Sequence, residues 1–161
     1  MYKKIMVPLD GSELAECVLP HVDSFVSGCQ VSTVVFVRVI DPTPLNVRGS
    51  YVTSKDDLDK LEASSKRIEA ERKSAAGQYL AQVAGRIKTD RVELKTEVVV
   101  GKVADSLVDY AEDNQVDLIL IATHGRSGVS RWVRGSIADR ILRAAKVPVL
   151  MVRAPGTPRE K

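Results

Sequence analysis

The sequence has few residues of the types that build disulfide frameworks, metal centres or membrane spans. Its 161 residues include two cysteines, Cys17 and Cys29, and two histidines, His21 and His124. Two thiols do not form a disulfide framework, and the spacing of these residues does not give a metal-ligand cluster. No apolar run reaches the ~18 residues that span a bilayer. The net charge of +3 is spread along the chain, so no basic block predicts binding to nucleic acid or to a membrane.

The length and composition are those of one ordinary globular domain. Hydrophobic residues make up 44% and charged residues 28% of the chain, which is long enough to bury a full core. We expect a domain over residues 1–153 and a loose polar tail over residues 154–161. The N-terminus enters a strand pattern directly, without a secretory signal, so we expect a cytoplasmic location.

Helix and strand periodicities alternate along the whole sequence. This alternation predicts an α/β fold, doubly wound, with a mostly parallel five-stranded sheet and helices on both faces. The expected strands are Ile5–Leu9, Thr33–Ile40, Val92–Val100, Asp117–Ala122 and Val147–Val152, and the expected helices are Ser12–Ser27, Asp56–Lys88, Ala104–Asn114 and Ser136–Ala145.

The first expected helix follows two residues that are suited to helix capping. Ser12 or Asp10 is expected to cap it, because both side chains accept hydrogen bonds from free backbone N–H groups. The helical period then places Leu14, Val18, His21 or Val22, and Phe25 on the inward face.

Doubly wound sheets bind ligands beyond the carboxyl ends of their strands, where the strand order reverses. Three segments are expected there: Pro8 to Asp10, Val39 to Asp41, and Ala122 to Gly128. The sequence therefore predicts one pocket formed by all three.

The familiar nucleotide and hydrolase motifs are absent. The segment Asp10-Gly-Ser lacks the three glycines of a dinucleotide fingerprint, and the chain contains neither a P-loop nor a Gly-x-Ser-x-Gly turn. A later loop remains, which ends in Gly135-Ser136 before a helical pattern. Free N–H groups and the helix dipole make such a position suitable for phosphate.

Three segments together carry a resemblance to a known family. They are the opening Ile5-Met-Val-Pro-Leu-Asp-Gly-Ser12, the loop Ala122-Thr-His-Gly125 followed by nine residues and Gly135-Ser136, and the closing Val147-Pro-Val-Leu-Met-Val152. Over nearly its whole length the chain resembles a single-domain universal stress protein. The resemblance implies a Rossmann-like fold of the adenine nucleotide alpha hydrolase-like type. The chain departs from the family pattern at Ala122, where the family has glycine, a residue that adopts positive φ without strain.

The resemblance also implies a nucleotide site. Asp10 would accept hydrogen bonds from the ribose or organise a metal-bound water, and Val39 would hold adenine through its backbone. Backbone N–H groups of the late loop and the Ser136 hydroxyl would bind the phosphates. The implied nucleotide-binding residues are Pro8, Asp10, Val39, Ala122, His124, Gly125, Arg126, Ser127, Gly128, Gly135, Ser136 and Ile137.

Structural roles remain open for several of these residues. Asp10 is equally suited to helix capping, and Arg126, Arg131 and Arg134 are suited either to phosphate or to solvent. His124 has no nucleophile or acidic partner beside it in sequence, which favours a structural or phosphate-facing role over general-base catalysis.

The resemblance predicts ATP as the ligand, with ADP or AMP as alternatives, and Mg²⁺ or Mn²⁺ accompanying the phosphates near Asp10. It implies a stress-response regulator that acts as a dimeric switch, with a homodimer formed through Val147–Val152, a strand expected at a sheet edge. An unidentified protein partner is expected at residues 42–70. Two alternatives stay open: a nucleotide-independent dimeric interaction module with a pocket altered at Ala122, and a slow ATP hydrolase.

Overall fold

The computed structural model describes residues 2–42, 55–123 and 137–154. Within them, five parallel strands form one sheet in the order β3-β2-β1-β4-β5. The strands are β1 (Lys4–Pro8), β2 (Thr33–Ile40), β3 (Glu93–Val100), β4 (Leu118–Thr123) and β5 (Val149–Arg153). The predicted fold class is confirmed, and β2 has the bounds that the sequence predicted.

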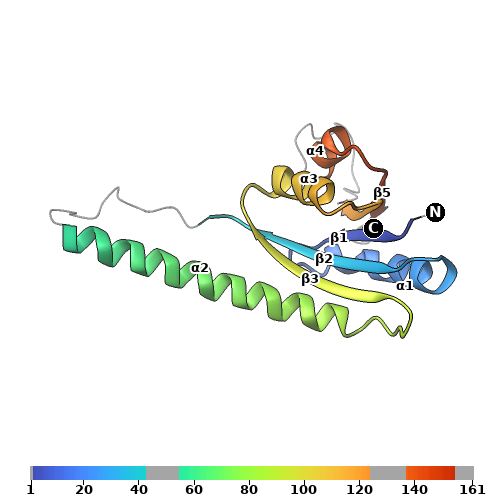
Figure 1. The fold of residues 1–161 in the computed structure, drawn as a ribbon, viewed down its shortest axis with the longest axis horizontal. Coiled ribbons are helices and arrows are strands. Elements are labelled where there is room, and N and C mark those ends of the chain that lie inside the picture. The colour runs from blue at the N-terminus through green and yellow to red at the C-terminus, as the bar shows by residue number, and fades with distance from the viewer. Residues whose placement is uncertain (1, 43–54, 124–136, 155–161) are drawn as a thin grey trace, which may run out of the picture.

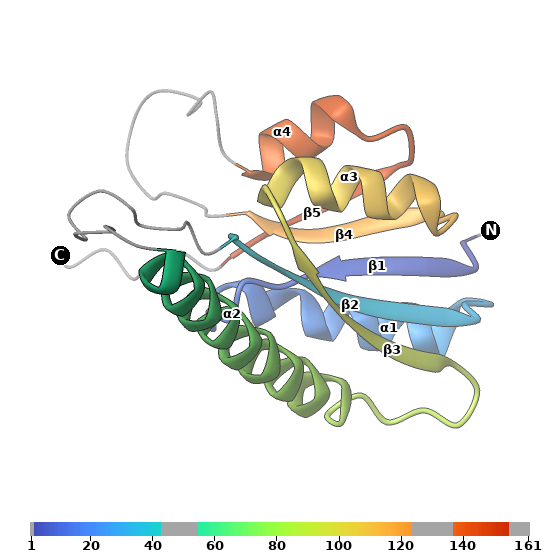
Figure 2. The same ribbon diagram turned by 60° about the vertical axis from the view of Figure 1, so that its left-hand side comes forward.

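Helices cover both faces of the sheet, as Figure 2 shows. On one face lie the 3-10 turn η1 (Ala15–Val18), α1 (Leu19–Gly28) and α2 (Lys55–Ala84); on the other lie α3 (Val103–Asp113) and α4 (Ile137–Ala144). Alternate residues of β2 enter two separate cores. Val34 and Phe36 pack in the first, beneath α1 and α2, whereas Val35 and Val37 pack in the second, beneath α3 and α4.

The chain enters its first helix differently from the prediction. A single helix from Ser12 was expected, but the backbone forms η1 first, and α1 begins at Leu19 with Pro20 in its first turn. Proline suits that position because its missing N–H would have no intrahelical partner there. The predicted inward face is correct at Val18 and Val22, which are buried, and at Phe25, which packs against the first core. It is wrong at Leu14, which is 42% exposed, and position 21 is exposed, so Val22 and not His21 faces inward.

The helix α2 extends well beyond the sheet (Figure 1). Its 30 residues correspond to about 45 Å at 1.5 Å per residue. Its buried residues, Ala76, Leu80 and Val83, all lie in the last third, and Leu58 and Ile68 in the projecting part are exposed. Gly77 lies inside the helix, while Gly85 follows its end. The sheet therefore supports α2 only near its carboxyl end.

The strand order places the reversal point between β1 and β4. From β1 the chain moves outward through β2 to β3, and after β4 it moves outward in the other direction to β5. Ligands of open α/β sheets bind at this point, beyond the carboxyl ends of the strands. Ala154, directly after β5, is buried and donates its N–H to Thr123 O at 2.9 Å, so the ends of β4 and β5 are held together.

Candidate functional site

A cleft of about 1350 Å³ lies at the carboxyl ends of the central strands. Its lining comes from the ends of β1, β2, β4 and β5, from Arg72, Ala75 and Ala76 of α2, and from the amino-terminal parts of α3 and α4. This volume is ample for a ligand of nucleotide size. The cleft therefore occupies the position that the strand order predicts.

Five of the residues implied by the resemblance line this cleft: Pro8, Asp10, Val39, Ala122 and Ile137. They come from four separate segments of the chain, which the sheet topology brings together. The other seven, His124, Gly125, Arg126, Ser127, Gly128, Gly135 and Ser136, lie outside the described residues.

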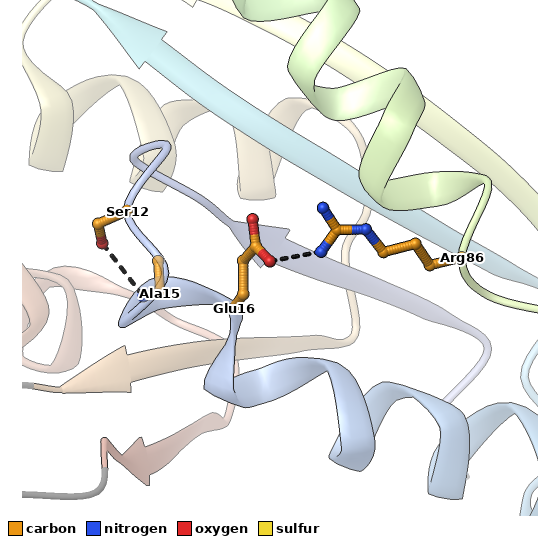
Figure 3. Close-up of polar contacts among 4 residues, drawn as sticks. All are labelled: Ser12, Ala15, Glu16 and Arg86. Atoms are coloured by element: carbon orange, nitrogen blue, oxygen red, sulfur yellow. Dashed lines mark hydrogen bonds and ion pairs between the residues drawn. The ribbon is translucent and has the colours of Figure 1, made fainter.

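The segment after β1 forms a tight turn at the cleft. The Ser12 N–H donates to Asp10 Oδ1 at 2.8 Å, and the Ser12 hydroxyl accepts from the Ala15 N–H at 3.2 Å (Figure 3). Gly11 between them has φ +90, a conformation that side chains with a Cβ rarely adopt. Leu14 is the N-cap residue of η1 and makes no capping bond with its side chain, whereas the Ser12 hydroxyl binds the N–H of Ala15, the first residue of η1. Asp10 shapes the turn through its bond to the Ser12 N–H, and its exposed carboxylate lies at the cleft.

Val39 and Ala122 approach the cleft from β2 and β4, the two strands that flank β1. Val39 packs with Val37 and Val99 on the face covered by α3 and α4. Ala122 is paired with Val152 in the extended backbone of β4, and Gln115 is the one described non-glycine residue with positive φ. The exchange of glycine for alanine at position 122 therefore adds a methyl group without backbone strain.

The amino end of α4 also reaches the cleft. Ile137, Ala138 and Asp139 all contribute to its lining, so the first turn of the helix lies there. Free backbone N–H groups at a helix amino end attract anions, and the helix dipole adds to this attraction.

Four arginines at the cleft were not predicted from the sequence. Arg38, Arg72, Arg143 and Arg153 line it together with Asp10, Asp41 and Asp139. Arg143 is paired with Asp139 at 3.1 Å. A guanidinium complements phosphate oxygens, so this lining favours an anionic ligand. Arg38 carried a usable signal, because it interrupts an otherwise apolar buried strand.

Arg38 joins a cluster of polar side chains beneath the Asp10 turn. Its guanidinium carbon lies 5.3 Å from the centre of the Tyr79 ring in α2. The Tyr79 hydroxyl is buried and makes no hydrogen bond of standard geometry to the described residues. Burial first, then the nearby Glu16 carboxylate, with a smaller contribution from Asp10, raise the pKa of Tyr79 to about 12, against the lowering effect of Arg38.

Among the described residues, no group of three or more His, Cys, Asp or Glu side chains is arranged to hold a metal ion. Asp10 is one carboxylate, so a divalent cation at this site would need further oxygen ligands, such as those of a phosphate chain. No helix in the described part of the chain is long and apolar enough to cross a membrane.

Residues 1–153 match the model of the Universal stress protein family. The chain belongs to this family. Two archaeal relatives from Methanocaldococcus jannaschii support the assignment. Universal stress protein MJ0531 is 30% identical over 158 residues, covering 96% of this chain and 84% of the relative. Universal stress protein MJ0577 is 28% identical over 156 residues, covering 95% of this chain and 96% of the relative.

Solved structures of the family share the fold. The structure of MJ0577 has a TM-score of 0.75 and 25% identity, covering 98% of this chain and 99% of that one. A universal stress protein from Archaeoglobus fulgidus in complex with dAMP has a TM-score of 0.56 and 23% identity, covering 93% of this chain and 97% of that one. A universal stress protein in complex with cAMP has a TM-score of 0.58 and 18% identity, covering 96% and 98%. These last two likenesses establish the fold.

Proposed function

We propose that the chain binds an adenine nucleotide in the cleft between β1 and β4 and acts as a nucleotide-dependent regulator in a stress response. The observation that carries this proposal is the convergence of Asp10, Val39, Ala122 and the amino end of α4 on one cleft at the reversal point of the sheet. The complexes of two similar folds with dAMP and cAMP support an adenine mononucleotide as the core of the ligand.

Each side of the cleft suits one part of a nucleotide. The Asp10 carboxylate is suited to accept hydrogen bonds from ribose hydroxyls, and the backbone at Val39 is suited to hold adenine. The amino end of α4 is suited to the phosphates. In this proposal the backbone N–H groups of Gly125 and Gly135 and the hydroxyl of Ser136 donate further hydrogen bonds to the phosphates. Pro8, Ile137 and the remaining loop residues complete the nucleotide site.

ATP is the ligand we propose first, with ADP or AMP as the alternatives. Mg²⁺ or Mn²⁺ would then be held mainly by phosphate oxygens, with Asp10 acting through a bound water. Such an ion neutralises phosphate charge. In this proposal the chain is a switch that holds its ligand and not an enzyme of rapid turnover.

The proposed switch is a homodimer in the cytoplasm, paired through β5. Two features support this interface. β5 lies at the end of the strand order, and Leu150 and Met151 on it are 39% and 38% exposed. An exposed edge strand with apolar side chains favours pairing with a second chain.

Calorimetric titration with ATP, ADP and AMP, each with and without magnesium, tests the function. We expect saturable binding of at least one nucleotide with a one-to-one ratio per chain. The variant Gly135→Val should abolish binding while the unfolding temperature in the absence of ligand stays close to that of the wild type. No binding of any adenine nucleotide would reject the proposal in favour of a nucleotide-independent interaction module. Phosphate release that disappears in Asp10→Ala would instead support the slow hydrolase.

A further inference from the structure

Arg38 lies against the turn that carries Asp10. A Cβ built on Gly11 would come within 2.9 Å of three guanidinium atoms of Arg38, its Cζ, Nη1 and Nη2. The guanidinium thus fills the space beside Gly11 that a side chain would occupy. A side chain at position 11 would therefore collide with the Arg38 guanidinium.

The guanidinium also lies over the ring of Tyr79. The cation–π distance of 5.3 Å is within the range in which an aromatic ring attracts a guanidinium. Arg38 therefore approaches both an aromatic ring of α2 and the backbone of the turn after β1. The sheet supports α2 near its carboxyl end, where Tyr79 lies, so the position of the ring is well fixed.

Arg38 approaches from the opposite side of β2 to Val39. Val34 and Phe36, which share the alternate positions with Arg38, pack in the core beneath α1 and α2, whereas Val39 packs beneath α3 and α4. The backbone proposed to hold adenine and the side chain that supports the turn are thus adjacent in sequence but directed to different faces.

We propose that Arg38 is a positioning residue for the nucleotide site, acting through the Asp10–Ser12 turn. Arg38 holds Gly11 in its left-handed conformation, and the Ser12 N–H bond to Asp10 Oδ1 then fixes the direction of the carboxylate. The inference rests on the proposed function for its consequence on ligand binding, but its structural part is independent of any ligand.

The planar guanidinium is required for both contacts. Lysine keeps the charge but presents a compact ammonium, which does not cover the Tyr79 ring and the turn at once. Methionine keeps most of the length of the side chain and removes both the charge and the planar end. We therefore expect Arg38→Lys to resemble Arg38→Met in its effect on the turn, rather than the wild type.

The first test needs no ligand. Amide hydrogen exchange followed by NMR reports on the Ser12 N–H, whose bond to Asp10 depends on the turn. We expect Arg38→Met to accelerate exchange at Ser12 about tenfold, the loss of one hydrogen bond to a charged group. Amides in the middle of β2 should remain protected. Arg140→Met is the matched control, because Arg140 pairs with Asp105 at 3.0 Å and does not line the cleft. Unchanged exchange at Ser12 in Arg38→Met would overturn the proposal.

The second test uses AMP as the probe in calorimetry. We expect Arg38→Met to weaken binding about tenfold and Asp10→Ala to weaken it at least as much. The double variant should bind no more weakly than Asp10→Ala alone, because Arg38 acts through Asp10. Additive losses would mean that Arg38 contacts the ligand itself and would overturn the positioning role. If the wild type does not bind AMP, the proposed function fails at that point, whereas the exchange experiment still decides the role of Arg38.

Discussion

Arg86, just beyond the end of α2, donates a hydrogen bond from its Nη1 to the Oε2 of Glu16 in η1 (Figure 3). The two residues are 70 positions apart in the sequence. Their pairing joins the segment after β1 to the supported end of α2, on the same side of the sheet as Arg38 and Tyr79. Glu16 is 20% exposed and Arg86 is 55% exposed, so solvent screens the pair only in part.

The variant Arg86→Met should lower the free energy of unfolding by about 0.5–1 kcal/mol, because a partly shielded ion pair is lost. Urea unfolding followed by circular dichroism measures this change. Lys60→Met is the control, since the Lys60–Asp56 pair is largely exposed at 74% and 79%. Equal losses in the two variants would show that the Glu16 contact contributes no more than an ordinary surface pair.

Tyr79 predicts a loss of stability at alkaline pH. Burial, Glu16 and Asp10 raise its pKa in the folded state to about 12, above the ordinary value of 10. A raised pKa contributes stability that is present below pH 10 and is lost as the pH rises towards 12. Denaturant midpoints measured from pH 9 to 11.5 should therefore fall less steeply in Tyr79→Phe than in the wild type. Parallel curves would contradict the effect. The pKa of Tyr110 is also raised by burial, so the pH dependence of Tyr110→Phe measures how much of the alkaline loss comes from this second tyrosine.

Asp117 predicts a loss of stability at acidic pH. Its Oδ2 accepts the backbone N–H groups of Lys4 and Lys3 at 2.8 and 2.9 Å, and these bonds lower its pKa below 3.8. A lowered pKa contributes stability that is present above the ordinary pKa and is lost as the pH falls through the folded value. Asp117→Ala should lower stability at pH 7 by about 1 kcal/mol and flatten the decline below pH 4. The carboxylate is exposed and lies at the amino ends of β1 and β4, so nucleotide affinity should not change.

The sheet and its cleft were predictable from the sequence because both depend on local patterns. Apolar runs of strand length and the punctuation by Pro8, Gly101 and Asp41 were sufficient to place the strands near their observed bounds, and Thr33–Ile40 was predicted without error. Once the strands were parallel, their carboxyl ends had to meet at one edge, which brought Asp10, Val39 and Ala122 together.

The features that the sequence did not predict depend on contacts between distant segments. The approach of Arg38 to both Gly11 and Tyr79 involves three separate segments, so no periodicity in one segment reveals it. The 3-10 turn before α1 reflects the path of the chain from the Asp10 turn to Pro20. The projection of α2 beyond the sheet could not be predicted from its helical periodicity either, because the same periodicity continues from the supported part of the helix into the exposed part.

Ala122 offers a direct test of how the family glycine is replaced. The residue lies in extended β4 and lines the cleft, so its methyl group is the relevant difference from glycine. Ala122→Gly should leave nucleotide affinity within about threefold and cost roughly 0.5–1 kcal/mol of stability through greater backbone freedom. Ala122→Leu should reduce affinity more strongly because its side chain enters the cleft. A large gain in affinity for Ala122→Gly would show instead that the methyl group blocks the ligand.

The β5 edge carries the prediction on assembly. If two chains pair through β5, the Leu150 side chain of each chain lies in the interface. Its side chain, 39% exposed in the single chain, then becomes buried. Leu150→Lys places like charges in this interface and should convert the dimer into a monomer at micromolar concentration. Size-exclusion chromatography with light scattering measures the mass directly. Leu58→Lys is the matched control, because Leu58 is 37% exposed but lies on the projecting part of α2. A dimer that persists in Leu150→Lys and dissociates in Leu58→Lys would move the interface from β5 to α2. If Leu150→Lys is a monomer, AMP titration of that monomer shows whether binding requires the dimer.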